Sequence, residues 1–270
     1  VNIKKQYFIE RRNLLSVIDK TLSSGNWVGG SEIDKFEESI SKICKTKYCV
    51  SLNSGTDALT LGLHLLGVRK GDEVITPPNS FVASTAVIVH LGARPVFVDV
   101  NKDQNINAEL IEKKITKKTK AIMPVHLYGN LFQTKKLKEK IRKNILIIED
   151  SAHAFCGEYN NVKLGKYSDF TVFSFYATKS ITCGEGGAII TNHKDHAQKI
   201  RSIANNGMTK PAFKRFENNK YIPWDVFNYG FKANLSDINA SILEDQIKNY
   251  KKTAKIKNKI FHQFKKHLSQ

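Results

Sequence analysis

Short apolar runs alternate with helix-like stretches along most of this 270-residue chain, and no other feature limits its fold as strongly. We predict strands where the runs are rich in β-branched or aromatic residues, and helices where apolar residues recur every three or four positions. The predicted strands are 48–52, 74–76, 95–98, 121–125, 145–148, 170–175 and 188–191, and the predicted helices are 57–66, 81–91, 134–143 and 235–246. Buried strands separated by helices predict an α/β fold of three layers, α/β/α, with a mainly parallel sheet in the middle.

The last part of the chain differs in character. After the predicted helix at 235–246, a Lys-rich segment at 248–266 continues as a basic helix toward Gln270, without a closing strand pattern. We therefore expect a large domain with an N-terminal segment over residues 1–247. Over residues 248–270 we expect the start of a helix that leads into a small, truncated C-terminal domain.

The charge balance is strongly basic: 43 Lys and Arg residues stand against 25 Asp and Glu residues, a formal net charge of +18. Such a charge would suit nucleic acid, but the lysines are scattered along predicted helices and do not alternate with aromatic residues, so we expect no nucleic-acid partner. No stretch approaches the roughly 18 to 20 apolar residues of a membrane helix. The N-terminus lacks a signal-peptide pattern, so we expect no membrane partner and a cytoplasmic location.

The four cysteines, at positions 44, 49, 156 and 183, show no CxxC spacing. A chain of this size can bury enough apolar surface to fold without disulfides. We therefore expect reduced thiols, and neither a disulfide framework nor a zinc ribbon.

Candidate site residues follow the predicted strands, where ligands of parallel sheets collect. Between the first strand and the first helix, Gly55 in the turn Ser54-Gly55-Thr56 lets a ligand approach the backbone, and the free N–H groups of the helix can bind a phosphate. Simple helix capping by Ser54 or Thr56 is the alternative. Phe81, at the start of the next predicted helix, can stack on a planar ligand or belong to the core.

Asp150 and His153 follow the apolar run 145–148. A carboxylate buried at a strand end needs a cationic or protonated partner, such as a protonated ring nitrogen, and His153 can orient a neighbouring hydroxyl. Metal ligation and a structural helix cap are the alternatives. Because there is no HExxH frame and no clear third histidine, we expect no metal.

Lys179 stands between the predicted strand 170–175 and the glycine-rich stretch 184–187. Burial at the edge of a sheet lowers the pKa of a lysine and makes its amine a nucleophile toward aldehydes. Ser174 adds a hydroxyl at the same strand end, while a solvent-exposed lysine beside a flexible hairpin is the alternative. Together these groups match the phosphate, flat ring, ring nitrogen and aldehyde of pyridoxal 5'-phosphate, which we predict as the cofactor.

With these residues identified, the sequence resembles the DegT/DnrJ/EryC1/StrS family of pyridoxal-phosphate-dependent sugar aminotransferases, which have fold type I. The resemblance extends from Trp27 to Gln246. The segments that carry it are SGTDAL at 54–59, GDEVITPPNSFVAS at 71–84, GARPVFVD at 92–99, IMPVHLYG at 122–129, IEDSAHA at 148–154 and FSFYATKSITCGEGGAI at 173–189.

The resemblance implies two catalytic residues. Lys179 would form a Schiff base with the cofactor and then act as the acid and base of the proton shift, and Asp150 would pair with the ring nitrogen. The other cofactor-binding residues that it implies are Gly55, Thr56 and Ser174 at the phosphate, Phe81 on the ring and His153 near the ring hydroxyl.

Two features depart from the usual family pattern. A segment that in many relatives reads Gly-x-Asn-x-Arg-Met and reaches the site of a neighbouring subunit is Gly-Phe-Lys-Ala-Asn-Leu at 230–235. By the resemblance, Lys232 would meet the phosphate across the interface of a homodimer with shared active sites. Relatives also continue for about another hundred residues, into the small C-terminal domain.

The expected activity is the transfer of an amino group from glutamate to a nucleotide-linked keto-deoxysugar, in the assembly of surface polysaccharides such as lipopolysaccharide. Some relatives with histidine in place of the lysine are dehydratases, and Lys179 favours transamination over dehydration. The sequence also leaves open a non-catalytic relative on the same fold, a basic nucleic-acid-binding protein and a metal-dependent hydrolase.

Overall fold

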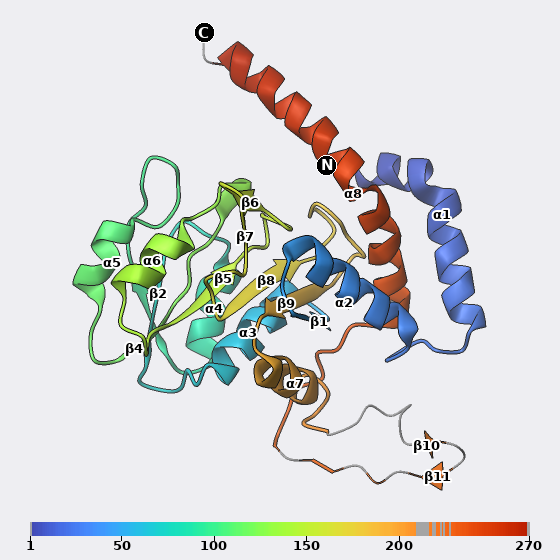
Figure 1. Ribbon diagram of the computed structural model, residues 1–270, viewed down its shortest axis with the longest axis horizontal. Helices are drawn as coiled ribbons and strands as arrows, with labels where there is room; N and C mark the ends of the chain where they lie inside the picture. The colour runs from blue at the N-terminus through green and yellow to red at the C-terminus, as the bar shows by residue number, and fades with distance from the viewer. Residues whose placement is uncertain are drawn as a thin grey trace.

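The fold comes from a computed structural model that describes residues 2–208, 216–217, 220–221, 223, 225–226 and 228–268 (Figure 1). The helices in this part are α1 (Ile3–Ser23), α2 (Ser31–Cys44), α3 (Gly55–Leu65), α4 (Val82–His90), α5 (Ala108–Lys114), the 3-10 turn η1 (Leu127–Gly129), α6 (Thr134–Lys140), α7 (Lys194–Ile203) and α8 (Asp237–Leu268). The strands are β1 (Tyr48–Leu52), β2 (Glu73–Thr76), β3 (Arg94–Phe97), β4 (Thr119–Ile122), β5 (Leu146–Asp150), β6 (Glu158–Tyr159), β7 (Val162–Lys163), β8 (Phe170–Ser174), β9 (Gly187–Thr191), β10 (Phe216–Glu217) and β11 (Lys220–Tyr221).

A seven-stranded sheet forms the centre of the molecule, in the order β1-β9-β8-β5-β4-β2-β3. The pairs from β8 to β3 are parallel, and only β9 runs antiparallel, to β1 on one side and to β8 on the other. The predicted α/β fold with a mainly parallel sheet is therefore confirmed. Helices cover both faces, because parallel strands need crossover connections that pass above or below the sheet.

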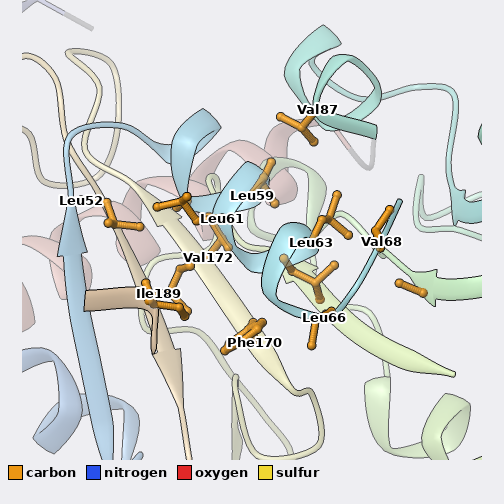
Figure 2. Packing of buried hydrophobic residues seen from close by; sticks show 14 of the residues in the cluster. Leu52, Leu59, Leu61, Leu63, Leu66, Val68, Val87, Phe170, Val172 and Ile189 are labelled. Carbon is orange, nitrogen blue, oxygen red and sulfur yellow. The ribbon is translucent and has the colours of Figure 1, made fainter. Parts of the chain in front are cut away.

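The alternation of side chains along each strand decides which face each residue occupies. Phe170, Val172 and Ile189 point to the face covered by α3, where they pack beneath its leucines (Figure 2). Phe173 and Ile190, one position along, point to the opposite face and pack against α2 and α8. Residues that are adjacent in the sequence are thus separated by the full thickness of the sheet.

Several predicted boundaries shift for local reasons. The predicted strand 121–125 ends at Ile122, and Pro124 explains the stop because it has no N–H group to donate to a ladder. The sequence reading missed α1, α2 and α7, and it gave no bounds for α5. Two of them are rich in charged residues and bury little: α1 buries Thr21 alone, and α7 buries Ala197, Ile200 and Ile203.

The two helical stretches predicted near the end of the chain form one 32-residue helix, α8. Its first half packs beside α1 and α2, and its second half projects away from the body (Figure 1). The predicted boundary between residues 247 and 248 lies inside this helix, where buried Ile247 is followed by mostly exposed residues. Residues 269 and 270 of the predicted second domain lie outside the described part.

None of the helices in the described part is apolar over a stretch long enough to cross a bilayer.

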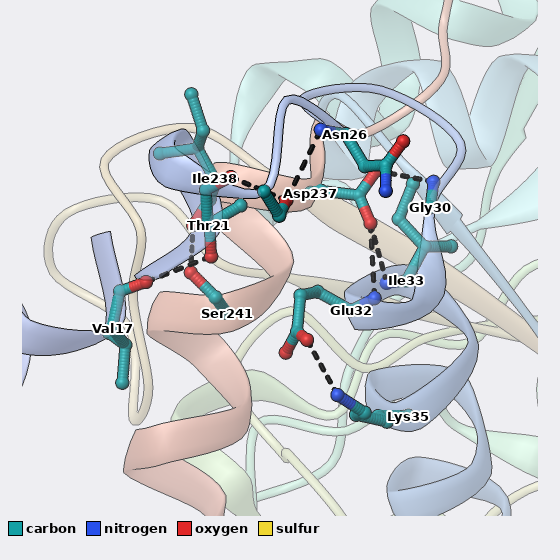
Figure 3. A network of polar contacts seen from close by, with 11 residues as sticks. Val17, Thr21, Asn26, Gly30, Glu32, Ile33, Lys35, Asp237, Ile238 and Ser241 are labelled. Carbon is teal, nitrogen blue, oxygen red and sulfur yellow. Dashed lines mark hydrogen bonds and ion pairs between the residues drawn. The ribbon is translucent and has the colours of Figure 1, made fainter. Parts of the chain in front are cut away.

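A buried carboxylate fixes the beginning of α8. The side chain of Asp237 accepts hydrogen bonds from the N–H groups of Gly30 (2.7 Å), Glu32 (3.1 Å) and Ile33 (3.3 Å), at the start of α2 (Figure 3). Its own N–H donates to the carbonyl of Trp27 at 2.9 Å. A negative charge at a helix N-terminus is favourable, so this contact joins two helices that begin far apart in the chain, at Ser31 and Asp237.

A second buried carboxylate, Glu149, lies on the face of the sheet opposite Asp150. It accepts hydrogen bonds from the hydroxyls of Thr134, Ser168 and Thr171 and from the N–H of Gly165. The imidazole of His126 lies 3.6 Å away. Burial raises the pKa of Glu149, but His126 and the hydroxyl donors outweigh it and lower the pKa to about 2.

We expect Glu149→Gln to lower the free energy of unfolding at pH 7 by roughly 3 kcal/mol, since the carboxylate titrates near pH 4.5 when unfolded. Because the folded pKa is the lower one, this stabilisation is complete above about pH 4.5 and is lost as the pH falls toward about 2. Urea unfolding at neutral pH and at two acidic pH values measures it. The difference in free energy of unfolding between the native chain and E149Q should shrink as the pH falls. A difference that stays constant would contradict the lowered pKa assigned to Glu149.

Candidate active site

Asp150 and Ser174 project from the carboxyl ends of neighbouring parallel strands, β5 and β8, on the face covered by α3. They share this face with Ile148 and Val172, which lie two positions earlier on the same strands. The sequence predicted that both residues stand at strand ends. The pleat of the sheet brings them to the same side.

A cavity of about 670 Å³ opens at this edge of the sheet. It lies between the start of α3, the start of α4, η1 and the loop that follows β8. Seven of the eight residues predicted to bind the cofactor line it: Gly55, Thr56, Phe81, Asp150, His153, Ser174 and Lys179. Residues from distant parts of the sequence thus surround one space of the size that holds a small-molecule cofactor.

The N-terminus of α3 forms one wall. The hydroxyl of Ser54 caps the helix by accepting from the N–H of Asp57 at 3.0 Å, as the capping alternative expected of Ser54. Gly55 and Thr56 open the helix, and N–H groups in a first turn have no partner within the helix. Together with the positive end of the helix dipole they can bind an anion such as phosphate.

Two glycines allow this wall to approach the strand ends. A Cβ on Gly55 would lie 2.8 Å from the Cβ of Ser174. A Cβ on Gly187, which is paired with Ser174 across β8 and β9, would lie 2.3 Å from the carbonyl oxygen of Ser54 and 2.7 Å from the nitrogen of Gly55. The glycine-rich stretch therefore supplies close packing, in addition to a turn.

We expect Gly187→Ala to displace the start of α3, because the clashing atoms belong to the backbone and cannot rotate away. Overpacking of this kind costs about 1–3 kcal/mol, and the affinity for a phosphate-bearing cofactor should fall by roughly tenfold or more. Thermal unfolding and a fluorescence titration with pyridoxal 5'-phosphate measure the two effects. Ala188→Gly, one position along, is the matched control for backbone changes in β9, and an affinity unchanged in G187A would contradict the packing argument.

Asp150 is buried, with 5% of its surface exposed. Its carboxylate accepts from the hydroxyl of Ser84 at 2.8 Å and from the N–H of Ala152 at 3.1 Å, both neutral donors. Within the described residues it has no ion pair. A buried carboxylate without a cation is costly, so a positively charged ring nitrogen in the cavity would complement it. Ser84, on α4, was missed in the sequence, where only its place in a predicted helix was visible.

Lys179 lies in the loop after β8 and is half-buried. Burial lowers the pKa of its amine, and the negative charge of Asp150 acts in the opposite direction. The net direction is downward, so the neutral, nucleophilic form is present over a wider pH range than in a free lysine. The alternative of a solvent-exposed lysine is not what the structure shows.

His153 is paired with Tyr128, a residue that the sequence reading missed. The two rings stack with 5.8 Å between their centroids, and the N–H of Tyr128 donates to Nδ1 of His153 at 3.3 Å. Nδ1 is then an acceptor, which leaves Nε2 to carry the proton of the neutral ring. Burial is the main cause that lowers the pKa of His153, and the positive charge of Lys179 lowers it further. Both causes favour this neutral form.

The backbone of Tyr128 has a φ of 54°, which is rare for a bulky residue and often marks a functional site. Tyr128 lines the cavity and is 84% exposed. Phe81 is 72% exposed and precedes the first turn of α4, so the alternative that it belongs to the core is wrong. Its ring is free to stack on a ligand.

Lys232 is the predicted site residue that does not line the cavity. Its segment, 230–235, lies beside the end of β1, where the N–H of Asn53 donates to the carbonyl of Ala233 at 2.8 Å. The Lys232 amine is exposed and donates a hydrogen bond to Asn234.

Across the described residues, no cluster of three or more His, Cys, Asp and Glu side chains has a metal-binding arrangement.

Fold and site together define a class: the fold-type-I transferases that depend on pyridoxal phosphate. Within it, this chain belongs to the DegT/DnrJ/EryC1/StrS aminotransferase family, whose model matches residues 9–270. The membership predicted from the sequence is confirmed. Aminotransferases of this family are pyridoxal-phosphate-dependent.

Two curated relatives and one solved structure illustrate the similarity. GDP-perosamine synthase of Caulobacter vibrioides is 38% identical over 237 residues, which are 86% of this chain and 60% of the relative. The spore coat polysaccharide biosynthesis protein SpsC of Bacillus subtilis is 36% identical over 233 residues, again 86% and 60% of the two chains. Spr1654 from Streptococcus pneumoniae, in its PLP-form, has a TM-score of 0.80 at 32% identity and covers 88% of this chain, which spans 64% of that structure. The chain thus spans about 60% of the length of these curated relatives.

Proposed function

We propose that this chain forms the cofactor-binding domain of an aminotransferase that moves an amino group from glutamate to a nucleotide-linked keto-deoxysugar. The observation that carries the proposal is the cavity that Lys179 and Asp150 share beside the start of α3. The nucleotide-linked substrate is supported by the name of the GDP-perosamine synthase relative. A role in surface polysaccharide assembly is supported by the name of SpsC.

The cavity fits pyridoxal phosphate on features of this chain alone. A helix N-terminus without side-chain obstruction at Gly55 suits the phosphate, and the buried Asp150 carboxylate, which forms no ion pair within the described part of the chain, suits the ring nitrogen. The half-buried amine of Lys179 suits the aldehyde. When bound, the cofactor supplies a carbonyl that accepts amino groups and a ring that withdraws electrons.

Each site residue then has a defined task. The N–H groups of Gly55 and Thr56 and the hydroxyl of Ser174 bind phosphate oxygens. The Asp150 carboxylate, oriented by Ser84, holds the proton on the ring nitrogen. His153, with its proton on Nε2, donates toward the ring oxygen, and Phe81 covers the ring. The Nζ atom of Lys179 would be the group that holds the cofactor covalently, and as a free amine it would be placed to accept and donate a proton beside it.

The proposal includes a homodimer in which Lys232 of each subunit reaches the phosphate of the other. Three observations support it: the exposed apolar side chains at the cavity mouth, the position of Lys232 outside the cavity of its own chain, and its exposed amine. A second copy would cover Phe81 and Tyr128 and exclude water from the site. Light scattering of the purified protein tests the dimer, and Lys232→Ala should weaken phosphate binding only in the dimeric form.

We also propose that residues 248–270 begin a second, smaller domain. The support is the row of exposed apolar residues on the projecting half of α8, namely Ile256, Ile260, Phe264 and Leu268, spaced one helical turn apart.

A cytoplasmic location is part of the proposal and is supported by four free cysteines, three of them buried.

A visible spectrum of the purified protein loaded with pyridoxal phosphate is the first test, followed by addition of glutamate. Conversion to the pyridoxamine form, and then amination of one member of a panel of keto-sugar nucleotides, would support the proposal. A cofactor spectrum that glutamate leaves unchanged would instead favour a dehydratase or a non-catalytic relative. Binding to random DNA without any cofactor spectrum would favour a nucleic-acid-binding protein.

A further inference from the structure

The loop that carries Lys179 is closed at its base by the sheet. The N–H of Phe175 donates to the carbonyl of Gly186 at 2.8 Å, and the N–H of Cys183 donates to the carbonyl of Phe175 at 3.2 Å. These bonds fix where the loop leaves and rejoins the strands. Between them, Lys179 is tied to the loop's own backbone by one bond, from its N–H to the carbonyl of Tyr176 at 2.9 Å.

The returning side of the loop, at Thr182, is held both by the strand end and by α8. The hydroxyl of Thr182 donates to the carbonyl of Phe175 at 3.0 Å. The side-chain oxygen of Gln246 accepts from the N–H of Thr182 at 2.9 Å, and its nitrogen donates to the carbonyl of the same residue at 2.6 Å. One side-chain amide thus pairs with a backbone peptide as a neighbouring strand would, and both backbone polar groups of Thr182 are satisfied. Two hydrogen bonds from one planar group fix orientation as well as distance.

A second residue of α8 reaches the same loop. The side-chain nitrogen of Asn239 donates to the carbonyl of Glu185 at 3.2 Å. Asn239 and Gln246 are separated by about two helical turns, so they lie on one face of α8. Asp237, at the beginning of the helix, is held against α2. The loop therefore rests on a helix whose own position is set independently of the loop.

We propose that Gln246 is a positioning residue for Lys179: by pairing with Thr182 it sets the conformation of the loop from which the lysine amine enters the cavity. This inference rests on the proposed function for its chemistry, but the contact itself exists without cofactor. It also makes α8 the link between the reactive amine and whatever packs on the projecting half of the helix. A shift of α8 along its axis would move Thr182, and with it the nearby Lys179.

The test compares Gln246→Met, which keeps the side-chain length and removes both hydrogen bonds, with Gln263→Met on the exposed half of the same helix. Without cofactor, we expect hydrogen exchange in the peptide 176–186 to be about tenfold faster or more in Q246M and unchanged in Q263M. With pyridoxal 5'-phosphate, borohydride trapping and peptide mass spectrometry should show covalent capture at Lys179 about tenfold slower in Q246M. Melting temperatures of both variants separate these local effects from global destabilisation.

The outcomes are distinct. Exchange and capture in Q246M within about twofold of the native chain would overturn the positioning role. Absence of capture in the native chain would refute the proposed function, while the exchange measurement would still decide whether Gln246 holds the loop. If Q246M does not fold, Gln246→Glu takes its place. It keeps an acceptor for the N–H of Thr182, but it sets a second carboxylate oxygen against the Thr182 carbonyl and adds a negative charge. Native-like exchange in that variant together with native-like capture would equally overturn the inference.

Discussion

Lys179→Ala is expected to give a folded protein that no longer forms a covalent bond with pyridoxal phosphate. Its rate of amino-group transfer should fall by a factor of about a thousand or more. The variant removes both the nucleophile and the group that moves the proton, and general acid–base catalysis alone contributes roughly 10²–10⁴-fold. Lys179 is half-buried and has no ion pair within the described residues. The substitution therefore leaves no partner charge unpaired, and the free energy of unfolding should hardly change.

The measurements are the visible spectrum after reconstitution, borohydride trapping followed by mass spectrometry, and the rate of glutamate-dependent transfer. Lys255→Ala, a lysine of the exposed half of α8, is the control for the loss of one positive charge and should behave as the native chain does. Native-like transfer by K179A would refute the assignment of this residue, and with it the proposed mechanism.

Asp150→Asn has the second-largest expected effect, and it should separate activity from stability. The amide has the shape of the carboxylate and can still accept from Ser84, but it cannot hold a protonated ring nitrogen. Loss of one electrostatic partner in a water-excluded site costs roughly 10²–10³-fold in rate. At the same time, removing a buried charge that forms no ion pair with the described residues should leave the stability of the cofactor-free protein equal or higher.

The neighbouring carboxylate provides the matched comparison. Glu149 points to the other face of the sheet and is fully hydrogen-bonded there, so Glu149→Gln should lose stability and keep the reactivity of the site. Thermal unfolding without cofactor and steady-state rates with it should therefore rank the two variants in opposite orders. A D150N variant that is strongly destabilised without cofactor and fully active when loaded would contradict the roles given to these residues.

Local pattern was enough to predict the strands of the seven-stranded sheet, the class of fold and the residues at the strand ends, but not the short pairs β6-β7 and β10-β11. Lys179 stands out because a lone cation separates an apolar run from three glycines, and Asp150 because a carboxylate follows an apolar run. Parallel strands bring their carboxyl ends to one edge of the sheet, so such residues were expected to meet. The charged helices α1 and α7 were missed because they bury few residues, Thr21 in α1 and three residues in α7, so neither shows a strong apolar period.

The sequence by itself therefore determined the α/β class, the family and the residues with reactive chemistry, because hydrophobic period and short motifs are local properties of a chain. Only the tertiary structure decided that Asp150 enters the cavity while Glu149 is buried on the far face, and that Ser84 contacts Asp150 and Tyr128 contacts His153 there. It also decided that Gln246 of α8 pairs with Thr182, in the loop that carries Lys179. Each of these contacts joins residues that are distant in sequence, and the packing of the pleated sheet against its helices brings them together.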